Sequence, residues 1–298
     1  MINTKHFKGI DFPIPEIGVN YAQGAIESYE GYIDEVSAIE GFSRVELIDS
    51  YGGNPIYGFI MGNTSKKHVI YIDGCIHKSH EWRTSYWIMH FMQVLSKPSL
   101  YPEMTQKIIE LKEKYSFCFL PVVAPDTFKS SIDGVYSYGN DNGVDIAQNF
   151  DYRWANTSNP KGSAPFSEPE TQNIRDIILN LKPVLYINCH SLGGNNRYVM
   201  RKPVNLHHEI LCSDLNETMN ISTPGSRYVG VASHNAVSSA YNWASGNEST
   251  QGRGIISNVF EVGDMQSALQ QSKIGVTGLL MHILHADNYL TYNSLRYC

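Results

Sequence analysis

Residues 182–194, KPVLYINCHSLGG, contain the stretch that decides the fold of this chain. The mainly apolar run inside it is typical of a strand buried on both faces, and the run ends at His190. A second strand-like run ends far upstream in GCIHKSHEWRTS, residues 74–85, which contains two histidines and a glutamate. Imidazole and carboxylate groups at the ends of separate strands are ligands for a metal, and Zn²⁺ takes three and leaves a fourth position for water. The pattern predicts a hydrolytic zinc site.

Strand-like runs and helix-like stretches alternate along the chain, as is typical of a parallel or mixed sheet with helices on both faces. The strand-like runs are residues 43–50, 54–62, 67–74, 116–125, 184–190, 197–200, 227–233 and 256–263. The helix-like stretches are residues 22–40, 84–95, 103–115, 167–181, 207–219 and 272–289. We expect an α/β fold: a single domain with a mixed, largely parallel central sheet flanked by helices.

Two local signals add detail. The turn sequence YGGN between the first two strand-like runs predicts a hairpin. Ser167 and Glu170 have the spacing of a capping box, which predicts that Ser167 caps the helix that follows.

Side chains able to do chemistry stand at the ends of three predicted strands. His77 and Glu81 follow one strand, His190 ends another, and Glu261 lies on a third. Ligands of such sheets bind at the carboxyl ends of the strands. We therefore expect these four residues to meet at one edge of the sheet.

Composition narrows the classes of function. The 298 residues, 42% of them hydrophobic, are enough for a large core, and no linker, charge block or repeat divides the chain. We predict an N-terminal extension over residues 1–20 and one catalytic domain over residues 21–298. A net charge of −6 without a basic cluster argues against a nucleic-acid partner.

The start of the chain lacks the apolar region of a secretory signal, and no run is long and apolar enough to span a membrane. The five cysteines are an odd number at no metal-binding spacing, which indicates a reducing compartment without a disulfide framework. We expect a cytoplasmic protein without membrane contact, with association with a virion as an alternative. The sequence does not indicate the oligomeric state.

Six segments, in order, resemble motifs of zinc metallocarboxypeptidases of the carboxypeptidase A type. They are GCIHKSHEW (74–82), PVVAPDTF (121–128), GVDIAQNFDYRW (143–154), KGSAPFSEPET (161–171), YINCHSLGG (186–194) and FEVGD (260–264). The resemblance extends from about residue 28 to the final helix. It implies that His77, Glu81 and His190 bind one zinc ion per chain. It also implies that Glu261 is the general acid and base.

The chain departs from the family in the spacing of its first motif. Three residues separate His77 from Glu81 where the family has two. Alignment on the Glu-Trp pair places Lys78 in the ligand position, and a protonated amine is a poor zinc ligand. We therefore keep His77, with a bulge of one residue before Glu81. The alternative is a site formed with His80, in which Glu81 is a helix N-cap.

A second departure affects the recognition of substrate. The family's Asn-Arg pair, which clamps a terminal carboxylate, is replaced by Ala147 and Gln148, and a glutamine brings no charge. No arginine lies between residues 128 and 149, where the family keeps the group that polarises the scissile carbonyl. His234 stands where the family has a tyrosine. Gln148 and His234 are thus the candidate substrate-binding residues, with Arg83 or Arg197 as replacement cations.

These features predict a zinc-dependent hydrolase of peptide or amide bonds with altered recognition of the C-terminal carboxylate. Its substrate would be an unusual peptide, such as a cell-wall or γ-linked peptide. One alternative is a deacylase of the aspartoacylase kind acting on acylated amino acids, although such enzymes also need an arginine. Another is a non-catalytic binding or structural module, for example in a virion, that retains the fold.

Overall fold

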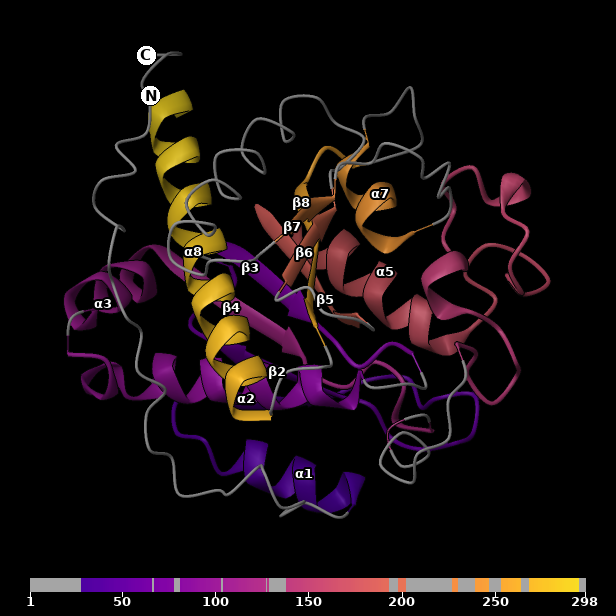
Figure 1. Ribbon diagram of the computed structural model, residues 1–298, viewed down its shortest axis with the longest axis horizontal. Coiled ribbons are helices and arrows are strands. Elements are labelled where there is room, and N and C mark those ends of the chain that lie inside the picture. The colour runs from indigo at the N-terminus through magenta and orange to yellow at the C-terminus, as the bar shows by residue number, and fades with distance from the viewer. Residues whose placement is uncertain are drawn as a thin grey trace.

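The central element of the computed structural model is one eight-stranded sheet in the order β1-β2-β4-β3-β5-β8-β6-β7 (Figure 1). The structure describes residues 28–65, 67–77, 81–102, 104–126, 128, 138–192, 198–201, 227–229, 239–246, 253–263 and 268–294. The strands are β1 (Ser43–Glu46), β2 (Tyr57–Met61), β3 (His68–Asp73), β4 (Tyr115–Leu120), β5 (Leu185–Leu192), β6 (Tyr198–Arg201), β7 (Arg227–Val229) and β8 (Ile256–Gly263).

The sheet is mixed, with a parallel centre. Strands β4, β3, β5 and β8 run parallel to one another, whereas β2 and β6 pair antiparallel with the two outer members of this group. Strands β1 and β2 form the predicted antiparallel hairpin. The carboxyl ends of the four parallel strands therefore lie at one edge, as the sequence predicts.

Helices cover both faces of the sheet. They are α1 (Tyr29–Ser37), α2 (Trp82–Ser96), α3 (Thr105–Lys114), α5 (Pro169–Leu181), α7 (Ala240–Ser245) and α8 (Ala268–Ser294), with 3₁₀ turns η3 (Pro98–Leu100), η4 (Ile146–Gln148) and η5 (Trp154–Asn156). Figure 1 shows α8, in yellow, lying across α2. No helix among the described residues is both long and apolar enough to cross a bilayer.

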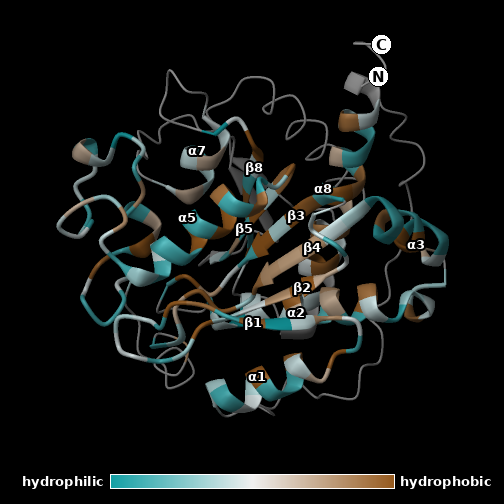
Figure 2. Cartoon of the chain, turned by 180° about the vertical axis from the view of Figure 1, so that it is seen from behind, coloured by the Kyte–Doolittle hydropathy of each residue, from teal (hydrophilic) through white to brown (hydrophobic). Residues whose placement is uncertain are grey.

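Alternating side chains of each central strand contribute to two cores. Ile70 and Ile72 of β3 pack with α1, α2 and α8 on one face, and Val69 and Tyr71 pack with α5 and α7 on the other. Figure 2 shows that hydrophobic residues predominate in β3 and β4, whereas α5 carries both kinds. Burial on both faces explains why these strands are apolar runs without the alternation of a half-exposed strand.

Helix α8 approaches helix α2 and strand β8 closely at two glycines. A Cβ atom placed on Gly275 would overlap the ring of Trp87, and one placed on Gly278 would overlap the ring of Phe260. Both rings are buried, so neither has open space to move into. The two glycines therefore set the distance between α8, α2 and β8.

The capping prediction for α5 is wrong, although the helix itself is confirmed. Glu168 is the N-cap, and its side chain makes no capping bond. The Ser167 hydroxyl instead donates to Glu168 Oε1 at 2.7 Å and accepts from Asn149 Nδ2 at 3.0 Å. A tertiary contact with the loop before the helix has thus replaced the local cap.

Other boundaries differ in detail. Helix α1 begins at Tyr29, and the first part of the predicted 22–40 helix lies outside the described residues, as does the helix predicted over 207–219. Helix α7 has six residues, too few for a recognisable period, and the sequence did not predict it. Cys75, Cys118 and Cys189, the three cysteines within the described residues, are buried thiols.

Candidate metal centre

A sharp turn after β3 brings His77 and Glu81 together. Cys75 adopts a left-handed backbone with φ of 53°, which is uncommon for a residue other than glycine. Its N–H donates to Thr84 Oγ1 at 2.6 Å, and that hydroxyl donates to the carbonyl of Glu81 at 2.7 Å. The turn is thereby tied to the first residues of α2, and Glu81 is held next to the end of β3.

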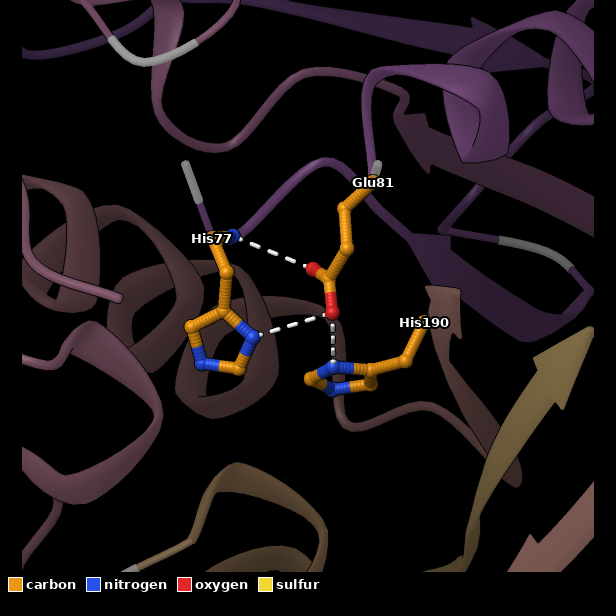
Figure 3. Close-up of side chains that lie close together, drawn as sticks. All are labelled: His77, Glu81 and His190. Carbon is orange, nitrogen blue, oxygen red and sulfur yellow. Dashed lines mark hydrogen bonds and ion pairs between the residues drawn. The ribbon is translucent and has the colours of Figure 1, made fainter. Parts of the chain in front are cut away.

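Three side chains converge at this edge of the sheet (Figure 3). Glu81 Oε1 lies 2.9 Å from Nδ1 of His77 and 2.9 Å from Nδ1 of His190. One potential ligand atom from each residue lies within 4.8 Å of the others. The side chains are 12%, 4% and 10% exposed for His77, Glu81 and His190. Two imidazole nitrogens and one carboxylate oxygen are a donor set that suits Zn²⁺ with an open coordination position.

The position of Glu81 bears on the two alternatives for the first motif. Glu81 is the residue before α2, but its side chain makes no capping hydrogen bond. Its Oε2 accepts from the N–H of His77 at 3.1 Å, so the carboxylate turns toward the histidines (Figure 3). The structure thus brings His77, Glu81 and His190 together. His80 lies outside the described residues, and its exclusion from the ligand set stays a prediction.

Electrostatics keeps this cluster charged. Burial opposes ionisation of Glu81, yet the neighbouring His190 and His77 hold its pKa well below the ordinary value. Burial likewise lowers the pKa of His77, but the charges of Glu81 and Asp145 and their hydrogen bonds raise it well above the ordinary value. The two shifts have one cause: a cationic group and carboxylates share a site from which most water is excluded.

Asp145 orients His77 from the other side of the ring. Its Oδ1 lies 3.2 Å from Nε2 of His77 and also accepts from the N–H of Ala147, so Asp145 caps η4. Asn159 Nδ2 donates to Asp145 Oδ2 at 3.2 Å. A carboxylate next to Nε2 favours a proton on that nitrogen and leaves Nδ1 available to a metal.

Glu261 lies beside the histidine of β5. His190 and Glu261 are register partners on the parallel strands β5 and β8, and Glu261 is buried. The register places Glu261 next to His190 on the sheet, and its role as general acid and base stays a prediction.

The structure gives a partial account of the two candidate substrate-binding residues. Gln148 ends η4, and its Oε1 accepts from Thr157 Oγ1 at 3.1 Å. His234 and Arg197 lie outside the described residues. The guanidinium of Arg83 lies over the ring of Trp82, 5.5 Å from its centroid.

Sequence reasoning missed three residues of this centre: Asp145, Asn188 and Asp73. Asn188 Oδ1 lies 2.6 Å from His190 Nε2, and Asn188 Nδ2 donates to Asp73 Oδ1 at 2.7 Å. Asn188 and Asp73 are polar residues inside runs that are otherwise apolar, and that interruption was the available signal.

Comparisons with known proteins agree with this geometry. A family model described as zinc carboxypeptidase matches residues 29–267. Carboxypeptidase B of Helicoverpa zea is 30% identical over 198 residues, which are 57% of this chain and 43% of that protein. The match therefore spans less than half of that relative's length.

Solved structures show the same fold at low identity. A metallo-carboxypeptidase from Burkholderia cenocepacia superposes with a TM-score of 0.66 at 16% identity, covering 88% of this chain and 69% of that one. Carboxypeptidase A from Helicoverpa armigera gives a TM-score of 0.66 at 18% identity, covering 87% of this chain and 73% of that one. Because the family model covers most of the chain, this protein belongs to the zinc carboxypeptidase family.

Proposed function

We propose that this chain is a zinc-dependent hydrolase of peptide or amide bonds, with one zinc ion held by His77, Glu81 and His190. The observation that carries the proposal is the convergence of three ligand atoms within 4.8 Å in a largely buried cluster. The match to the zinc carboxypeptidase family supports it. A preserved ligand set also favours an enzyme over a non-catalytic module that retains only the fold.

The residues around the cluster divide the work of hydrolysis. A bound zinc ion supplies Lewis acidity and lowers the pKa of water. Glu261 acts as the general base and then as the general acid, because it is a buried carboxylate on the strand next to His190. Asp145 keeps His77 oriented with Nδ1 toward the cluster. Two carboxylates thus have separate duties: Glu81 binds metal, and Glu261 transfers protons.

The proposed substrate is a peptide whose terminal carboxylate is not the main recognition element. Gln148 replaces the family's clamp arginine, and its Oε1 already accepts from Thr157. A neutral amide cannot form the charged, bidentate pair that an arginine forms with a carboxylate. Cell-wall and γ-linked peptides fit this requirement. Deacylation of N-acyl amino acids fits it less well, because that reaction also relies on a carboxylate.

The test combines metal analysis with a matched set of peptides. We expect about one zinc per chain after loading and dialysis, with activity lost to a chelator and regained on addition of zinc. Peptides of one sequence with free, amidated and γ-linked ends would separate the substrate classes. A folded protein that binds zinc but cleaves no member of this set or of a peptidoglycan preparation would favour the binding module. A folded protein without stoichiometric zinc would contradict the proposal.

A further inference from the structure

The second ring nitrogen of His190 ends a buried chain of hydrogen bonds. Nε2 lies 2.6 Å from Asn188 Oδ1, and Asn188 Nδ2 donates to Asp73 Oδ1 at 2.7 Å. The other oxygen of Asp73 accepts from the Tyr186 hydroxyl at 2.8 Å. Asp73 and Tyr186 are fully buried, and Asn188 is nearly so. The contacts of this chain are therefore made inside the protein, away from solvent.

The pairing of strands creates this chain. Asp73 and Asn188 are register partners on the parallel strands β3 and β5, so their side chains stand next to each other on the same face. His190 follows two residues later on β5 and points to that face as well. Strand register therefore places Asn188 between Asp73 and His190 in this chain of hydrogen bonds.

The carboxylate decides which way the Asn188 amide faces. Burial raises the pKa of Asp73 to about 6, against the hydrogen bonds from Asn188 and Tyr186 that lower it, so the group is mostly ionised at neutral pH. An ionised carboxylate only accepts hydrogen bonds, and the NH₂ group of Asn188 must face it. The amide oxygen must then face His190, and an oxygen can only accept from Nε2–H. The Asn188 contact thus fixes a proton on Nε2, and Nδ1 is the nitrogen that faces Glu81 and can bind a metal once it has lost its proton.

We propose that Asp73 is a positioning residue that acts through Asn188 to hold His190 with its proton on Nε2 and its Nδ1 lone pair toward the metal centre. Asp145 holds His77 in the same orientation through a direct contact with its Nε2. Both histidines therefore turn Nδ1 toward Glu81. Asp145 contacts His77 directly, whereas Asp73 reaches His190 through the Asn188 amide. The consequence for metal affinity rests on the proposed zinc site, whereas the consequence for the His190 tautomer does not.

The experiment compares wild type with D73N, D73N/N188D and Y186F. In D73N the side chain at position 73 can offer either an amide oxygen or an amide NH₂ group. The Asn188 amide is then no longer held with its NH₂ group toward position 73. In the double variant, the amide introduced at position 73 donates to the carboxylate introduced at position 188. That carboxylate accepts from His190 Nε2–H and so restores the preference for a proton on Nε2. Y186F is the matched control, because it removes one hydrogen bond from Asp73 and leaves the Asn188 contact intact.

The primary readout is the position of the His190 proton, measured by long-range ¹H–¹⁵N correlation in the metal-free protein well above the ordinary imidazole pKa. We expect Nε2–H in wild type, Y186F and the double variant, and loss of that preference in D73N. The second readout is zinc affinity by competition with a chromophoric chelator. D73N should weaken affinity roughly 10–100-fold, the size typical of such supporting contacts, and the double variant should recover most of the loss.

Several outcomes would overturn the inference. A folded D73N protein with the wild-type tautomer and the wild-type zinc affinity would show that Asp73 positions nothing. If D73N does not fold, N188A supplies the test: it must lose the Nε2–H preference, and retention of that preference would overturn the proposal. A wild-type protein that binds no zinc would contradict the proposed function, and the tautomer measurement would still decide the role of Asp73.

Discussion

His190 and Glu261 are side by side in the parallel register of β5 and β8. In a parallel pair, register partners project from the same face, so a candidate metal-binding imidazole and a second carboxylate become neighbours through strand pairing alone. No loop has to be ordered to bring them together. The placement of the proposed proton-transfer group is therefore as rigid as the sheet.

Replacement of Glu261 by glutamine should separate chemistry from metal binding. We expect E261Q to fold, to keep zinc, and to lose at least roughly 10²-fold in kcat, the usual size of general acid and base catalysis. Zinc content and steady-state kinetics measured on the same preparation test this. Loss of zinc in E261Q would instead make Glu261 a ligand.

Removal of either histidine ligand should abolish stoichiometric zinc. H77A and H190A each remove one of three protein ligands, and affinity should fall by orders of magnitude. H68A is a matched control, because His68 is an exposed residue at the start of β3, the strand that precedes His77. Metal analysis after dialysis provides the measurement. Stoichiometric zinc in folded H190A would disprove the ligand assignment.

The alternatives in the first motif predict opposite results for Glu81 and His80. Because Glu81 Oε1 contacts Nδ1 of both histidines, E81A should lower zinc occupancy while H80A leaves it nearly intact. The same dialysis and metal analysis apply to both variants. The reverse pattern would establish a site made of histidines alone.

Zinc affinity should rise with pH across the neutral range. Burial lowers the pKa of His77, but the adjacent Glu81 and Asp145 raise it well above the ordinary value. Both ring nitrogens of metal-free His77 therefore carry a proton at neutral pH, and one of these protons must leave when its nitrogen binds metal. Calorimetry in buffers of different ionisation enthalpy should detect release of about one proton per zinc, with a weaker Kd at lower pH. Equal affinity without proton release would contradict this assignment of charge.

Recognition of a free C-terminus should be weak. Amidation of a good substrate should change kcat/KM by less than about tenfold, or about 1.4 kcal/mol, because Gln148 brings no charge to a carboxylate. Q148R is the complementary change and should increase the preference for the free acid. Efficient removal of single residues from ordinary C-termini by wild type, lost on amidation, would show that another cation has replaced the clamp.

The sequence was sufficient where local pattern and global fold agree. The apolar runs that became β3, β5 and β8 predicted a largely parallel sheet, and the polar residues at their ends predicted the meeting of His77, Glu81 and His190. Glu261 follows as the register partner of His190. The sequence was insufficient where a side chain's role depends on register. Asn188 contacts Asp73 only because β3 and β5 pair in one alignment, and no local pattern specifies that alignment. The same reason applies to Ser167, whose hydroxyl contacts Asn149 instead of capping α5.

The close approach of Gly278 to Phe260 means that a substitution on α8 can affect the candidate metal centre from the opposite face of the sheet. Phe260 directly precedes Glu261 on β8, and successive side chains of a strand project to opposite faces. A methyl group at position 278 would overlap the Phe260 ring, so we expect this substitution to shift β8 and with it the neighbouring Glu261. Helix α8 therefore supports the strand that carries Glu261 from the opposite face of the sheet. Substitutions that adjust the position of Glu261, in nature or in directed evolution, need not alter any residue that a substrate touches.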